Sequence, residues 1–141
     1  MIRSSLLAAA AAMALFSFAA HAEMVKFHTT MNGASEVPPN DSKGTGTVEA
    51  TLDTSTKKLD YTANWKDLSG PATAAHFHGP AAPGANAGVV VPWGTSPTSP
   101  HKGSATLTDQ QEADLMAGKW YANVHTKEHS PGEIRGQMTK E

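Results

Sequence analysis

The chain has 141 residues, with 11 Lys and Arg against 13 Asp and Glu, 7 His and no Cys. This length has room for one domain, so a multidomain enzyme is excluded. The net charge of -2 does not supply the basic field that nucleic acid requires, so nucleic acid is excluded as a partner. Because Cys is absent, disulfides cannot support a small exported fold, and the histidines become candidate metal ligands.

The N-terminus has the pattern of a secretory signal peptide. Arg3 precedes an apolar stretch over residues 6–20, and Ala20-His21-Ala22 has the A-x-A spacing of a cleavage site. The apolar stretch is shorter than the ~20 residues that a membrane-spanning helix needs. We therefore predict a signal peptide over 1–22 and a single mature domain over 23–141, with no membrane span after cleavage and a periplasmic or secreted location.

The mature chain reads mainly as short strands. A first strand is expected to begin near residue 24. The clearest local signal is a β-hairpin over 45–65, where apolar and polar residues alternate on both sides of a polar turn at 53–58. Alternation and turn residues predict further strands at 74–79, 87–91, 103–107, 119–126 and 133–138.

One short helix interrupts the strands. Thr108 to Gln111 have the spacing of a capping box, Leu115 and Met116 give the segment an apolar side, and Gly118 is placed to end it. Many short strands with Gly/Pro-rich turns and a single helix predict an all-β fold, an antiparallel β-sandwich or barrel.

Two segments rich in Gly and Pro, 79–88 and 92–100, are predicted to be surface loops or lids. Trp65 and Trp120 fall at strand positions and are expected in the core. Trp93 lies between Pro92 and Gly94, so it is expected to be exposed, where it would shield a metal or dock a partner.

Four histidines form the candidate metal site. His76 and His78 are two residues apart, so on a strand both rings leave the same face, while Phe77 points to the other. His125 ends a later strand and is the natural third ligand; His129 is a candidate fourth ligand or a solvated loop residue. His28 and His101 are expected to be surface histidines.

Three neutral imidazoles with an open position suit copper, zinc, nickel or iron. Cu(II) favours tetragonal nitrogen and oxygen ligation and stands high in the affinity order, so one copper ion is the expected cofactor. The sequence leaves the oligomeric state open.

Four segments of the chain resemble the CHRD domain family, named from chordin and found in small exported bacterial proteins. They are GASEVPP at 33–39, AHFHGP at 75–80, YANVHT at 121–126 and PGEIRGQ at 131–137. From the first segment to the last, the resemblance spans residues 33–137, which is most of the mature chain, and it implies a CHRD-like β-domain over 23–141.

A fainter likeness is to copper/zinc superoxide dismutase, a Greek-key β-sandwich whose copper is held by an H-x-H pair and a later histidine. His76, His78 and His125 occur in that order. The resemblance implies a Greek-key topology and makes Arg135 a candidate catalytic residue that guides an anion; the alternative for Arg135 is an ion pair with Glu36 or Glu133. Residues 79–108 contain no Asp or Glu, so the zinc subsite of the dismutase has no counterpart.

Other chemistries have weaker support. There is no G-x-S-x-G nucleophile motif and no Cys, so nucleophilic hydrolysis is discarded. No pair of acids stands out for glycoside hydrolysis. The leading hypothesis is a copper-binding protein in copper handling or superoxide-dismutase-like redox defence. The rival hypothesis is a non-enzymatic module without metal that presents a loop such as 79–88 to a protein partner.

Overall fold

The computed structural model describes residues 14–17 and 21–141. The expected signal peptide, 1–22, lies largely outside the described residues. Among the residues described, no helix is both long and apolar enough to cross a bilayer.

The described chain is almost entirely β-structure, as predicted. Its elements in chain order are β1 (Met24–Asn32), η1 (Gly33–Ser35), β2 (Thr45–Asp53), β3 (Lys58–Lys66), β4 (Ala72–His78), β5 (Val89–Thr95), β6 (His101–Thr106), α1 (Asp109–Met116), β7 (Tyr121–Thr126), β8 (Ile134–Gln137) and β9 (Thr139–Lys140).

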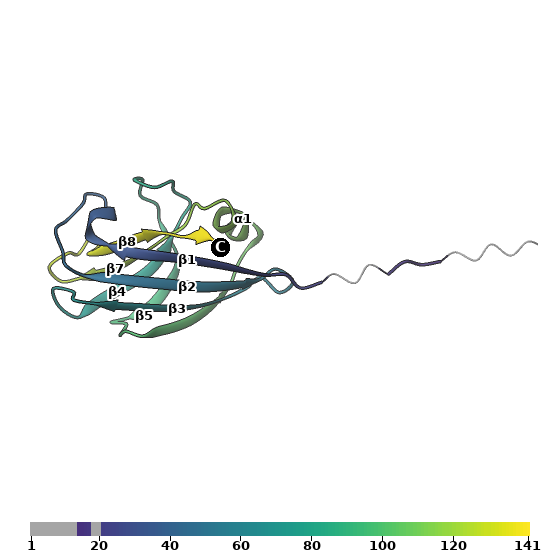
Figure 1. Ribbon diagram of the computed structural model, residues 1–141, viewed down its shortest axis with the longest axis horizontal. Coiled ribbons are helices and arrows are strands. Elements are labelled where there is room, and N and C mark those ends of the chain that lie inside the picture. Colours follow the sequence, from purple (N-terminus) through teal and green to yellow (C-terminus); the bar gives the residue numbers. More distant parts are fainter. Residues whose placement is uncertain (1–13, 18–20) are drawn as a thin grey trace, which may run out of the picture.

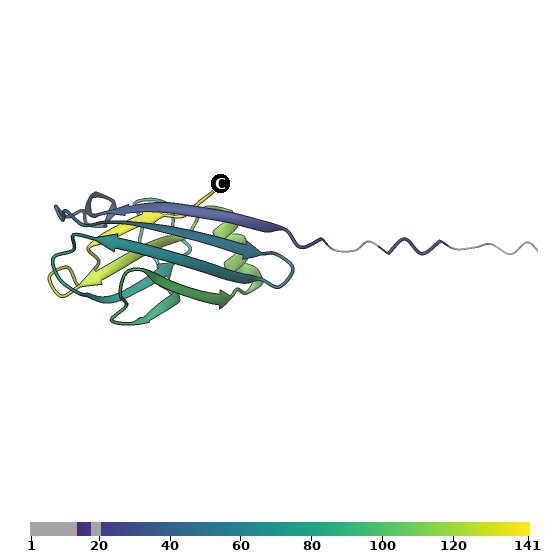
Figure 2. The same ribbon diagram turned by 60° about the horizontal axis from the view of Figure 1, so that its bottom comes forward.

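The strands form an antiparallel Greek-key sandwich that is nearly closed into a barrel (Figures 1 and 2). The strand order is β5-β4-β7-β8-β1-β2-β3-β6, and β9 pairs with β1. One half of the order is β5-β4-β7-β8 and the other is β1-β2-β3-β6, so the chain crosses between the halves after β3, after β5 and after β6. The halves join where β8 pairs with β1 at Asn32 and Arg135. This topology confirms the predicted fold class and lays β4 beside β7.

The β2–β3 hairpin follows the predicted alternation. Val48 pairs with Ala63 and Leu52 with Leu59, and all four side chains are buried in the core. Because period-2 alternation sends these residues to one face, the hairpin supplies one wall of the sandwich. Trp120 is fully buried, as expected, and Trp65 packs against the core while remaining half-buried.

The expectation for Trp93 was wrong. β5 continues through Pro92 to Thr95, and the Trp93 side chain is buried, with its ring centroid 5.0 Å from that of Phe77 and 5.6 Å from that of His101. A proline is tolerated there because β5 is an edge strand, whose outer N–H groups have no partner strand. The loop that we expected over 92–100 is therefore short, and His101, expected at the surface, is half-buried against Trp93.

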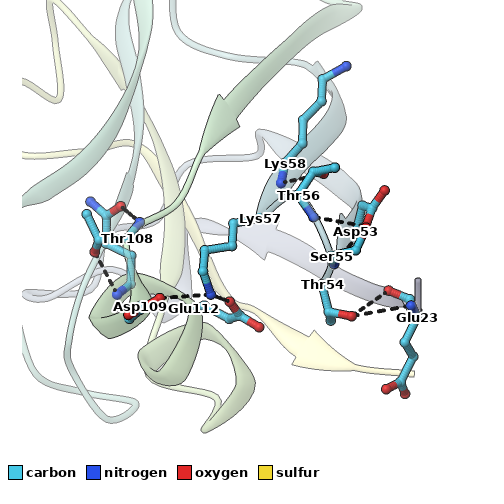
Figure 3. Close-up of polar contacts among 11 residues, drawn as sticks. Glu23, Asp53, Thr54, Ser55, Thr56, Lys57, Lys58, Thr108, Asp109 and Glu112 are labelled. Atoms are coloured by element: carbon cyan, nitrogen blue, oxygen red, sulfur yellow. Dashed lines mark hydrogen bonds and ion pairs between the residues drawn. The ribbon is translucent and has the colours of Figure 1, made fainter. Parts of the chain in front are cut away.

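The short helix is held at both ends by the contacts that its sequence predicts. The Thr108 side chain accepts from the Gln111 N–H and the Gln111 side chain accepts from the Thr108 N–H, which completes the capping box. Gly118 follows the helix with a φ of 73°, in the left-handed region. In Figure 3, Lys57 of the β2–β3 turn lies 2.8 Å from Asp109 and 2.7 Å from Glu112, which docks α1 on the hairpin.

A second polar cluster, which we call the Glu133 network (Ser42, Ser69, Thr126, Glu133), is centred on a buried carboxylate. The fully buried Glu133 carboxylate accepts from Ser42 Oγ at 2.8 Å, Thr126 Oγ1 at 2.7 Å, the Ser69 N–H at 2.9 Å and the Ser69 hydroxyl. Burial opposes ionisation, but the hydrogen bonds from Ser69, Thr126 and Ser42 lower the pKa of Glu133. The network ties two loops to β7.

Candidate metal centre

His76 and His78 leave β4 on one face, as the H-x-H spacing predicts. Phe77 points to the opposite face, where it is fully buried among core aromatics. The ring centroids of the two histidines lie 5.2 Å apart. Core packing of Phe77 therefore fixes the direction of both imidazoles.

β7 brings His125 to the same place. β7 pairs with β4 so that Ala74 faces His125 and His76 faces Asn123 across the ladder. His125 Nε2 lies 3.2 Å from His76 Nδ1. One ring nitrogen from each of His76, His78 and His125 lies within 4.8 Å of the other two, and we call these residues the histidine cluster. The structure thus brings together three of the four predicted ligands.

Backbone carbonyls orient two of the rings. His125 Nδ1 lies 2.8 Å from Ser130 O, and His78 Nδ1 lies 3.0 Å from Ala87 O. A carbonyl oxygen can only accept, so each Nδ1 carries the proton and each Nε2 presents a lone pair. A neutral imidazole held in this way has the form that binds a metal.

The electrostatics of the cluster also favour neutral rings. Burial, helped by the neighbouring His125 and His78, lowers the pKa of His76 to about 4. Burial likewise lowers the pKa of His78, although hydrogen bonds to Ala87 and Asn123 oppose the shift. At neutral pH, protons therefore do not compete for the ring nitrogens of His76 and His78.

The remaining histidines lie elsewhere. His129 is not part of the cluster; its backbone N–H donates to Thr126 Oγ1 and its carbonyl accepts from the Gly132 N–H, so the residue builds the β7–β8 turn. His28 is exposed on β1, 3.7 Å from a carboxylate oxygen of Glu141.

Arg135 lies close to the cluster and packs on an aromatic ring. The Tyr121 ring stacks on His78 with centroids 4.8 Å apart, and the central carbon of the Arg135 guanidinium lies over the Tyr121 ring, 3.5 Å from its centroid. The guanidinium donates to Asn86 Oδ1 at 2.9 Å and to Ala85 O at 2.5 Å. The side chain is 2% exposed. Arg135 therefore packs on Tyr121 and holds the β4–β5 loop through hydrogen bonds. It does not form the close ion pair with Glu36 or Glu133 that was the alternative. Its role as an anion guide stays a prediction.

Sequence reasoning missed two polar residues beside the cluster. Asn123 Oδ1 lies 2.9 Å from His78 Nε2, and the Asn123 side chain is buried. Glu36 is buried behind Asn123, and its burial raises the pKa of its carboxyl to about 7 despite the opposing charge of Arg135. A signal for Asn123 was available, because it precedes His125 by two residues and so shares its face of β7.

The model of the CHRD domain family matches residues 27–138. No curated protein matches the chain, and no solved structure matches it. The likeness to superoxide dismutase therefore receives no support from these comparisons.

Proposed function

This chain belongs to the CHRD domain family, and we propose that it is an exported protein, periplasmic or secreted, that binds one copper ion through His76, His78 and His125. CHRD domains are extracellular, which supports export. Copper handling is the role that we assign to the site.

One observation carries the proposal: three ring nitrogens from two neighbouring strands converge within 4.8 Å. Imidazole nitrogens bind a divalent ion at about 2.0 Å, so a shared ion needs the rings this close. Two of the rings already carry their proton on the nitrogen that faces a carbonyl. Copper is preferred over zinc because it stands higher in the affinity order for nitrogen ligands.

The test is a titration of the purified, chelator-treated protein with Cu(II). We expect one ion per chain, and a melting temperature that rises with added copper because the metal binds the folded form. The double variant His76→Ala/His125→Ala is expected to lose both effects. The matched control, His28→Ala/His129→Ala, removes two histidines outside the cluster and should bind as the wild type does. Equal binding in both double variants would refute the site.

Redox catalysis is tested separately, by superoxide consumption of the copper-loaded protein against the same concentration of free copper. A rate above that of free copper that depends on Arg135 would support a dismutase-like role. A rate no higher than that of free copper would leave copper handling alone.

A second candidate function is protein interaction, which CHRD domains mediate. Residues 82–86 of the β4–β5 loop are exposed. Hydrogen bonds nevertheless fix the loop: the Arg135 guanidinium donates to Ala85 O and Asn86 Oδ1, and the Tyr121 hydroxyl donates to Ala87 O. An exposed loop held in one shape suits a docking surface. If this module acts without metal, adding a chelator will not change its melting temperature, and no copper will bind at stoichiometric level.

A further inference from the structure

His78 lies between two acceptors. Its Nδ1 faces Ala87 O at 3.0 Å and its Nε2 faces Asn123 Oδ1 at 2.9 Å. Both oxygens can only accept hydrogen bonds, whereas a neutral imidazole has one N–H. With that proton directed to Ala87, a lone pair of Nε2 confronts a lone pair of Oδ1 in a buried position.

The other end of the Asn123 amide hydrogen-bonds to the Glu36 carboxyl group. Nδ2 lies on the side of Glu36, and the two groups sit against Gly132, where an added Cβ would collide with Glu36 Oε1 and come within 2.8 Å of Asn123 Nδ2. Gly132 has a φ of 134°, which favours glycine. Turning the amide over would place its oxygen beside the Glu36 carboxyl group, which repels an oxygen when it is ionised, so the ionised form of Glu36 favours an Oδ1 that points at His78.

A metal ion bound between His78 Nε2 and Asn123 Oδ1 would remove the repulsion between the two lone pairs, because both would then coordinate the cation. Ligands bonded to one ion at about 2.0–2.2 Å and separated by about 90–105° lie roughly 3 Å apart. The spacing of His78 Nε2 and Asn123 Oδ1 is 2.9 Å, and that of His76 Nδ1 and His125 Nε2 is 3.2 Å. Both pairs have the separation of neighbouring ligands.

We propose that the Asn123 side-chain oxygen is a fourth ligand, which makes the centre a set of three nitrogens and one oxygen, and that Glu36 is a positioning residue that holds the amide. This inference rests on the proposed function, since it concerns the same ion. Cu(II) favours tetragonal coordination by nitrogen and oxygen ligands, so three imidazole nitrogens with one amide oxygen suit it better than three imidazole nitrogens alone. A carboxyl group behind a ligand is the usual way in which a protein orients it.

The first test compares Cu(II) affinity and electron paramagnetic resonance spectra of the wild type, Asn123→Leu and Asn123→Asp. Leu has a similar shape without a donor, so we expect binding about 10- to 100-fold weaker and an altered copper hyperfine pattern. Asp keeps an oxygen donor and adds a charge, so affinity should be equal or higher. Asn64→Leu, on the exposed face of β3, is the control and should leave affinity and spectrum unchanged.

A second measurement needs no variant. Protein labelled with ¹³C at the asparagine side-chain carbonyl is loaded with Cu(II) and studied by electron–nuclear double resonance, and we expect a ¹³C coupling from a carbon one bond beyond the ligand oxygen. Absence of that coupling in copper-loaded protein would overturn the assignment of Asn123 and leave the histidine site intact. Failure of the wild type to bind copper would instead overturn the proposed function, and this inference with it.

The electron paramagnetic resonance spectrum of the bound copper tests whether Glu36 positions the Asn123 amide. Glu36→Gln keeps the shape but lets the side-chain amide donate as well as accept, so the hold on Asn123 is weakened. We expect a smaller loss of affinity than for Asn123→Leu, with a mixture of two copper spectra. One unchanged spectrum would show that Glu36 is only structural.

Discussion

The histidine cluster and the Glu133 network each include one residue of β7, His125 and Thr126, and their hydrogen bonds are satisfied to different degrees. In the Glu133 network, every hydrogen bond to the carboxylate comes from a hydroxyl or N–H donor. Beside the histidine cluster, His78 Nε2 faces Asn123 Oδ1, and Glu36 Oε1 is buried without a hydrogen-bond partner.

We interpret this difference through the proposed copper site. A buried polar group whose hydrogen bonds are complete stabilises the fold, whereas two acceptors that face each other without a donor cost free energy, and a bound cation would remove that cost. The two buried carboxyl groups follow the same division, because the pKa of Glu133 is lowered and that of Glu36 is raised. Variants in the two clusters should therefore affect different measurements.

The largest effect on stability is expected for Glu133→Ala. The change leaves the Ser69 N–H and the buried hydroxyl of Thr126 without their acceptor, and it should lower the free energy of unfolding by about 3 kcal/mol. Chemical denaturation of the metal-free protein measures it. Glu128→Ala, at an exposed position, should change little.

The same denaturation experiment on His76→Ala/His125→Ala completes the comparison. Without metal, this double variant should lose less than Glu133→Ala, because both rings are only half-buried. If the histidine variant were the less stable of the two, the division between the clusters would be wrong.

Acid should remove the contribution of Glu133. Its pKa is lower in the folded protein than the 4.5 of a free glutamate, so the ionised carboxylate stabilises the fold above pH 4.5. That stabilisation is lost as the pH falls through the pKa of the folded state. We expect the stability difference between wild type and Glu133→Gln to shrink below pH 4.5 in equilibrium unfolding; a constant difference would argue against the ionised network.

The smallest effect is expected for Ser42→Ala. It removes one donor to Glu133 and the acceptor of the Gly44 N–H, while the three other contacts of the carboxylate remain. The free energy of unfolding should fall by about 1 kcal/mol, with copper affinity unchanged. A change in copper affinity would show that the two clusters are coupled through β7.

Much of the fold followed from local pattern. The hairpin over 45–65 and the capped helix could be predicted because alternation and capping act over a few residues. Trp93 could not be placed in this way. Whether a strand passes through Pro92 depends on β5 being at the edge of the sheet, which is a property of the whole topology.

The histidines show the same limit. The shared face of His76 and His78 follows from a spacing of two, but the approach of His125 depends on the register of β4 against β7. The sequence leaves His129 as a candidate fourth ligand or a loop residue, because its position there does not distinguish a ligand from a turn residue. The position of Asn123 on the same face as His125 could be predicted, but the contact of its side-chain oxygen with His78 Nε2 depends on the register of β4 against β7.

The most direct measurement is an anomalous difference map recorded at the copper absorption edge from crystals of the copper-loaded protein. The account predicts one strong peak per chain, within about 2.0–2.2 Å of ring nitrogens of His76, His78 and His125. A peak at His28 and Glu141, at His129, or at no histidine would contradict it.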